Sequence, residues 1–150
     1  MTTKRLSQLL YCLLCMLMLS ACSEGQFETK DSWIAEAPPN VIAQAGYLTL
    51  DNNTSKPMSL ISATSDAFEK IQIHRSEHDK ATGLVKMIHE KKANIPAHTT
   101  LKFKPGGYHL MLINPKSSLK KGDQTAIKLT FADGTEFNIT FAVRREKFTL

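Results

Sequence analysis

Apolar and polar side chains alternate along most of this chain, with a period of two rather than 3.6. Successive side chains of a β-strand point to opposite faces of a sheet, so this period predicts half-buried strands. The predicted strands lie at residues 47–50, 70–74, 84–89, 100–103, 108–113, 125–132 and 136–143. No segment after residue 33 has the spacing of a long amphipathic helix, so we expect an all-β domain.

Clusters of turn-forming residues separate these segments. They lie at residues 51–57, 105–107, 121–123 and 133–135, and they are rich in Gly, Pro, Asn and Asp. The last cluster, Asp133-Gly134-Thr135, predicts a hairpin between residues 125–132 and 136–143. Several short strands with regular turns are typical of an antiparallel β-sandwich or barrel, which is the fold class that we expect.

The first 21 residues have the composition of an export signal. Lys4 and Arg5 give a positive start, residues 9–19 (LLYCLLCMLML) are apolar, and small residues lead to Cys22. This order resembles a bacterial lipobox, in which the thiol is lipidated and Cys22 becomes the mature N-terminus. We therefore expect a signal peptide at 1–21, lipidated Cys22 with a short tether at 22–30, and a folded domain at 31–150. The alternatives are an uncleaved anchor and a signal without lipidation.

Composition excludes several functions for the expected domain. With Cys12 and Cys15 in the signal and Cys22 lipidated, the domain has neither a disulfide nor a free thiolate. The net charge of +5 includes Lys4 and Arg5, so residues 22–150 carry +3 from scattered lysines. A solvated surface explains that charge, with attraction to anionic lipid headgroups as the lesser option. Nucleic acid is not an expected partner of an exported lipoprotein.

Catalysis is also not expected. The domain has no thiol nucleophile and no recognisable nucleophile elbow. Ser76 lies near His74 and His78 in the sequence, but no acid partner or oxyanion loop accompanies them. We therefore expect a binding protein rather than an enzyme.

His109 and Met111 are the first candidate ligands. They lie two residues apart in the predicted strand 108–113, on the face opposite Leu110 and Leu112. An imidazole and a thioether with this spacing point to the same side of a sheet. The two side chains can therefore converge on one ligand.

Two other predicted strands carry similar donors. Met87 and His89 share a face of 84–89, and His74 lies on the polar face of 70–74. Imidazoles and thioethers without thiolate or carboxylate favour Cu(I) over zinc, magnesium or calcium. The alternative is ordinary packing of the methionines and solvent exposure of the histidines. However, of the three methionines after residue 22, Met87 and Met111 each lie two residues from a histidine.

One stretch of the sequence resembles a known family. Residues 104–112 read KPGGYHLML, which resembles the K-P-G-G-Y-H-x-M-L signature of the periplasmic copper chaperones called PCu(A)C. Other stretches that fit are Trp33-Ile34, Ala37-Pro38-Pro39, 45–50 (AGYLTL), Ile73-His74, 83–87 (GLVKM) and 119–123 (LKKGD). The similarity covers roughly Trp33 to Val143, which is nearly the whole expected domain.

The resemblance implies a set of metal ligands. The family pattern is H-x10-M-x21-H-x-M, and its second half matches Met87, His109 and Met111. Twelve residues rather than ten separate His74 from Met87, and we assign the two extra residues to a turn at 77–82. The implied copper ligands are therefore His74, Met87, His109 and Met111.

Some alternatives stay open. His78, or a rearranged loop, is the alternative source of the first ligand. Val85 stands where the family often has a further methionine, so a backup ligand is missing. His89 is a candidate to compensate for it or to bind Cu(II). His98 follows Pro96-Ala97 in a predicted turn, and we expect no role for it.

The resemblance also implies a function. It implies a cupredoxin-like antiparallel β-fold of Greek-key type that binds one Cu(I) ion. Copper would pass to cytochrome c oxidase assembly, either directly to the CuA subunit or through Sco-type chaperones. The competing hypothesis is a metal-free β-sandwich that binds protein or lipid. A blue-copper electron carrier is disfavoured because such centres need a Cys thiolate.

The expected location is the periplasm, with a lipid anchor in a membrane. Ser23, rather than Asp, follows Cys22. By analogy with Gram-negative lipoprotein sorting, this residue favours the outer membrane over the inner membrane. A monomer is the expected state for such a domain.

Overall fold

The computed structural model describes residues 25–38 and 40–145 of the 150-residue chain. These residues form ten strands and no helix, which confirms the all-β prediction. The strands are β1 (Phe27–Ala35), β2 (Ala43–Asn52), β3 (Met58–Thr64), β4 (Phe68–His78), β5 (Val85–Glu90), β6 (Ala93–Ile95), β7 (Thr99–Phe103), β8 (Tyr108–Pro115), β9 (Gln124–Phe131) and β10 (Glu136–Arg144). Within the described ranges no helix is long and apolar enough to cross a membrane. The predicted signal at 1–21 and the predicted lipidation site Cys22 lie outside the described residues.

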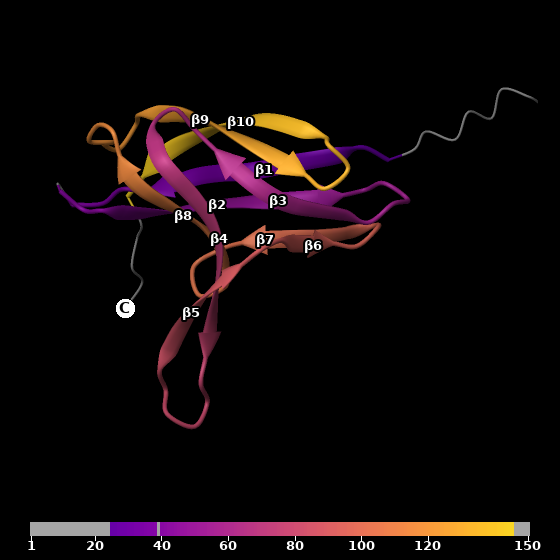
Figure 1. The fold of residues 1–150 in the computed structure, drawn as a ribbon, viewed down its shortest axis with the longest axis horizontal. Coiled ribbons are helices and arrows are strands. Elements are labelled where there is room, and N and C mark those ends of the chain that lie inside the picture. Colours follow the sequence, from indigo (N-terminus) through magenta and orange to yellow (C-terminus); the bar gives the residue numbers. More distant parts are fainter. Residues whose placement is uncertain (1–24, 39, 146–150) are drawn as a thin grey trace, which may run out of the picture.

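The strands form one sheet with the order β5-β4-β8-β7-β2-β1-β10-β9-β3-β6. Most neighbours are antiparallel, but β1 pairs with β10, and β7 with β8, in parallel. The long strand β2 pairs with β8 through its first half and with β7 through its second half. Strands β3 and β4 lie near opposite ends of this order, yet they contact each other. The sheet therefore folds over on itself (Figure 1), and the buried side chains form a core inside it.

Alternation along each strand produces the core. Fully buried side chains include Leu48 and Leu50 on β2, Leu110 and Leu112 on β8, and Phe131 on β9. Each such side chain contributes about 1.5–3 kcal/mol when it leaves water. On β8 the inward positions alternate with outward ones, as the sequence predicts. The opposite face of this strand is therefore available to carry functional side chains.

The predicted C-terminal hairpin is present. Strands β9 and β10 pair antiparallel from Thr130–Glu136 to Gln124–Ala142. In the turn, the Asp133 carboxylate accepts a hydrogen bond from the Thr135 backbone N–H at 2.9 Å, and Gly134 has a φ of 86°. Glycine adopts that left-handed conformation without steric cost, which explains its place in the turn.

Two segments expected to be irregular belong to strands. The turn predicted to start at residue 51 begins later, because β2 runs through Asn52. The tether expected at 22–30 contains the start of β1, which pairs with β2 from Phe27 onward. The Phe27 ring packs on the rings of Phe131 and Phe137, with centroids 5.0 and 5.2 Å away. Packing of this partly buried aromatic side chain against the core explains strand formation in a segment without clear periodicity.

The hairpin of β4 and β5 projects from the body of the domain (Figure 1). Its strands pair in unbroken register from Ile73 opposite Glu90 to His78 opposite Val85. The turn predicted at 77–82 therefore lies two residues later, at 79–84. The Asp79 carboxylate fixes it by accepting hydrogen bonds from two backbone N–H groups, those of residues 81 and 82. Neighbouring strand β8 completes the surface on which the candidate ligands lie.

Candidate functional site

Three histidines form a row across strands β5, β4 and β8. His74 on β4 lies directly opposite His89 on β5 and directly opposite His109 on β8. Residues directly opposite each other in an antiparallel pair share a face of the sheet. The centroid of the His74 ring lies 5.5 Å from that of the His89 ring and 5.7 Å from that of the His109 ring. Two imidazoles that bind one metal at about 2.0–2.1 Å place their centroids roughly 4.5–6 Å apart, so each pair fits a shared ion.

His109 is held with one nitrogen free for a metal. Its side chain is only 6% exposed, although it lies on the face opposite Leu110. The Nδ1–H group donates a hydrogen bond to the Gly107 carbonyl at 3.1 Å. Because a carbonyl can only accept, the proton sits on Nδ1 and the lone pair of Nε2 is available.

His74 carries an unused lone pair in a buried position. Its Nε2–H group donates to the Gln72 side-chain oxygen at 3.2 Å, so Nδ1 has no proton. Nδ1 is buried, and it has no hydrogen-bond partner in the described structure. A buried nitrogen without a partner is costly, because it has lost water and gained nothing. Coordination of a metal ion at Nδ1 would satisfy this atom.

The methionines lie on opposite flanks of His74. Met111 is opposite Gln72 on the β8 side, and Met87 is opposite Ser76 on the β5 side. Each is therefore a diagonal neighbour of His74, at about 7–8 Å between backbones. Of the four predicted ligands, the register makes His74, His109 and Met111 immediate neighbours. Met87 shares their face, but it lies beyond His74 from the other two and is 62% exposed.

Of the remaining histidines, His78 lies at the edge of this surface. His78 is the last residue of β4 and is exposed, four residues from His74 and on the same face. A Cβ atom added to Gly106 would lie 3.7 Å from its Nε2 atom. His98 lies in the turn before β7 with a φ of 55°, as the turn prediction expects.

Sequence reasoning missed the hydrogen bonds that orient the donors. Those bonds come from Gln72 and the Gly107 carbonyl, each two residues along the chain from its histidine. Spacing of two on a strand was the available signal, but a glutamine or a glycine at that spacing is common.

In the described residues, no three His, Cys, Asp or Glu side chains form a group that could hold a metal ion.

Burial lowers the pKa of His74 below its usual value of 6.5, and the nearby His109 and His89 lower it further. A lowered pKa keeps the imidazole neutral, which is the form that binds metals. In the metal-free protein, we expect the NMR titration of the His74 ring to have its midpoint below pH 6.5. Replacing both neighbours, in a His89→Gln/His109→Gln variant, should raise that midpoint. An unshifted midpoint in the unmodified protein would contradict the burial of this ring.

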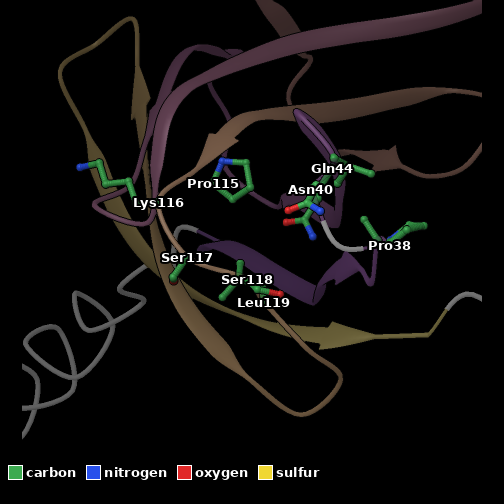
Figure 2. Close-up of a pocket in the computed structure, with 10 residues that line it drawn as sticks. Pro38, Asn40, Gln44, Pro115, Lys116, Ser117, Ser118 and Leu119 are labelled. Atoms are coloured by element: carbon green, nitrogen blue, oxygen red, sulfur yellow. The ribbon is translucent and has the colours of Figure 1, made fainter.

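A separate cavity of about 240 Å³ lies between the segment that precedes β2 and the segment that follows β8 (Figure 2). Gln44 of β2 lines it together with Pro38, Asn40, Pro115 and Ser118. The buried Gln44 side-chain oxygen has no hydrogen-bond partner among the described atoms. None of the predicted copper ligands lines this cavity, so the donor surface is a distinct feature.

Solved structures with the same fold are copper-binding domains. The solution structure of Cu(I)-bound DR1885 from Deinococcus radiodurans is 26% identical, with a TM-score of 0.65 over 85% of this chain and 84% of that chain. The copper-bound PCuAC domain from PmoF2 is 21% identical, with a TM-score of 0.67 over 83% of this chain and 97% of that chain. The fold is therefore that of the PCuAC domains, a cupredoxin-like β-structure, as predicted.

Sequence comparison defines the family. Residues 27–143 match the family "Putative lipoprotein LpqE-like", and the chain belongs to that family. Putative lipoprotein Lxx21020 of Leifsonia xyli subsp. xyli is 30% identical over 118 residues, which are 78% of this chain and 69% of that protein. Uncharacterized protein RP573 of Rickettsia prowazekii (strain Madrid E) is 36% identical over 96 residues, which are 61% of this chain. The match spans only half the length of the Rickettsia protein. These matches indicate no catalytic family.

Proposed function

We propose that this chain is a lipid-anchored copper chaperone that binds one Cu(I) ion and hands it to an acceptor protein. The observation that carries the proposal is the buried, unpartnered Nδ1 atom of His74, whose ring lies 5.7 Å from that of His109. The hydrogen bond from His109 to Gly107 leaves its Nε2 lone pair available as a second donor. Two oriented imidazoles at this separation suit a shared metal ion.

Thioethers support copper in the Cu(I) state. Met111 is a diagonal neighbour of His74 and lies two residues from His109 on the same face. A neutral donor set of two imidazoles and a thioether is soft and carries no charge, which favours Cu(I) over harder divalent ions. The likeness to DR1885, which was solved with Cu(I), supports the same choice.

The proposed ligands are His74, His109, Met111 and Met87. The first three are neighbours in the sheet, and Met87 is the donor nearest to solvent. An accessible site with few ligands suits handover, because ligands of an acceptor can bind before those of the donor leave. Copper then moves between proteins without becoming a free ion.

The proposed location and destination rest on the sequence. Membership of a lipoprotein family supports lipid attachment at Cys22 and a periplasmic domain. Ser23 favours the outer membrane. The resemblance to PCu(A)C chaperones makes cytochrome c oxidase assembly the proposed destination, through its CuA subunit or a Sco-type chaperone.

A Cu(I) competition titration of the full chain tests the proposal. We expect binding of one equivalent, and we expect Met111→Leu to weaken it about tenfold or more, because a thioether ligand is lost. Met58→Leu is the matched control, since Met58 on β3 packs against the core and pairs with β6. Absence of binding by the unmodified chain would overturn the proposal and leave the metal-free β-sandwich lipoprotein.

A further inference from the structure

The start of β1 is fixed against the loop that follows β2. Phe27 pairs with Asn52 of β2, and its ring packs on that of Phe131. Two residues earlier, a Cβ atom built on Gly25 would overlap the backbone carbonyl of Asn53. Only glycine lets two backbones approach so closely. The chain is therefore held to the domain from Gly25 onward.

The connection between Gly25 and the proposed lipid anchor is very short. Only Ser23 and Glu24 separate Gly25 from Cys22. Consecutive Cα atoms are about 3.8 Å apart, so these three steps span at most about 11 Å. A lipid on Cys22 would keep the membrane surface within roughly that distance of Gly25. The end of the domain that carries Gly25 therefore lies nearest to the lipid.

Three turns meet at this end of the domain, which we call the anchor end. They are residues 53–57, 96–98 and 132–135. The Asn52 side chain joins the first two turns, because it donates to the carbonyl oxygens of Lys56 and Pro96. The third turn connects β9 to β10 beside the Phe27 ring. The three turns contain one lysine, Lys56, and one acidic residue, Asp133, so they carry no net charge with histidine neutral.

The opposite end of the sheet is basic. Strand β1 has nine residues at about 3.3 Å each, so its far end lies roughly 25 Å from the anchor end. There the Glu36 carboxylate accepts hydrogen bonds from the Lys121 backbone and from the Arg145 side chain. Basic residues outnumber acidic ones at this end: Lys116, Lys120, Lys121, Arg144 and Arg145 against Glu36, Asp66 and Asp123. Attraction to anionic lipid would therefore turn this end, and not the anchor end, toward a membrane.

We propose that the anchor end is the membrane-contact surface of this protein, and that it faces the layer of lipid headgroups. The inference rests on the proposed lipid anchor at Cys22 and adds the orientation of the domain. Met111 lies opposite Ala45, seven residues before Asn52 on β2, so the donor surface stands about 20 Å from the anchor end. The hairpin of β4 and β5 leaves the body across the direction of β1 (Figure 1). The proposed copper ligands therefore face the aqueous space, where an acceptor protein can reach them.

Fluorescence quenching tests this orientation. Residues 23–150 contain no cysteine, so a bimane dye can be attached to one introduced thiol of the lipidated full chain. Ser55→Cys places the dye at the anchor end, and Ser117→Cys is the matched control at the opposite end, since both serines are exposed. The vesicles contain phosphatidylethanolamine, anionic phosphatidylglycerol and a phosphatidylcholine with a nitroxide on its headgroup.

We expect quenching to be about threefold stronger or more at position 55 than at position 117, because the tether keeps only the anchor end close to the headgroups. Stronger quenching at position 117 would show that the basic end faces the lipid, and it would overturn the proposal. Equal quenching at the two positions would overturn it as well.

Lengthening the tether tests the cause of the orientation. Insertion of about 20 Gly and Ser residues after Glu24 gives a flexible linker with a mean span of roughly 25 Å. We expect the difference between the two positions to fall below about 1.5-fold in this variant. A difference that survives the insertion would overturn the short tether as its cause. Mass spectrometry of the same samples detects the lipid on Cys22, and an unmodified Cys22 would instead overturn the proposed anchor itself.

Discussion

We expect replacement of His74 with glutamine to weaken the proposed Cu(I) binding more than any other single substitution on this surface. His74 lies between His89 and His109, and both methionines are its diagonal neighbours. Loss of its imidazole therefore removes a ligand from every arrangement that the register allows. We expect the Cu(I) affinity of His74→Gln to fall about 100-fold or more, as measured by competition titration of the full chain.

The fold should survive this substitution. The His74 side chain lies on the outer face of β4. The preceding residue, Ile73, lies on the inner face and is only 3% exposed. A far-ultraviolet circular dichroism spectrum equal to that of the unmodified chain would separate lost ligation from lost structure. His98→Asn should keep the full affinity. If His74→Gln also kept it, the first ligand would come from another histidine, with His78 as the nearest alternative along β4.

Periodicity along the strands predicted which face of the sheet most of the candidate donors occupy. The two-residue alternation along β8 predicts that Leu110 and Leu112 face the core while His109 and Met111 lie on the opposite face. In the structure Leu110 and Leu112 are fully buried and Met111 is partly exposed, whereas His109 is covered on its own face and only 6% exposed. That inference needs only local geometry, because the side-chain direction in a strand follows from the backbone pleat. A local rule therefore suffices to predict which face of the strand each donor occupies.

Strand pairing could not be predicted in the same way. The row of His89, His74 and His109 depends on the registers of β4 with β5 and with β8. A shift of one residue in either register would send donors to opposite faces, and no local signal fixes it for the distant pair β4 and β8. The division of the donors into two flanks is likewise a property of the register.

The end of β2 shows why turn propensity alone was misleading there. Asp51, Asn52 and Asn53 are residues typical of a turn, but Asn52 pairs in the sheet and is fully buried. A buried amide is stable only when its polar atoms are bonded. One partner is the carbonyl of Lys56 within the same turn, but the other two are the carbonyls of Ile95 and Pro96, which the sequence of the turn does not reveal.

Replacing Asn52 with alanine should produce the largest loss of stability from a polar side chain in the described structure. Its Nδ2 group donates to the carbonyl oxygens of Lys56, Ile95 and Pro96 at 2.8, 3.0 and 3.1 Å. Its Oδ1 atom accepts from the backbone N–H and the hydroxyl of Thr54 at 3.2 and 2.7 Å. This one side chain thus ties the end of β2 to the following loop and to the end of β6.

Asn52 is 0% exposed, so removal of its amide leaves the neighbouring carbonyl groups without a hydrogen-bond donor. Each buried carbonyl group left without a donor costs about 1–3 kcal/mol. Some of the groups lie closer to solvent and can recruit water, so we expect a total loss of about 3 kcal/mol in the free energy of unfolding by urea. Asn53→Ala is the matched control, since Asn53 is exposed and adjacent, and it should change stability by less than about 0.5 kcal/mol. Copper affinity should stay unchanged in folded Asn52→Ala, because β2 contributes no proposed ligand. A loss below about 1 kcal/mol would show that water replaces the amide and that these hydrogen bonds do not hold the end of β2.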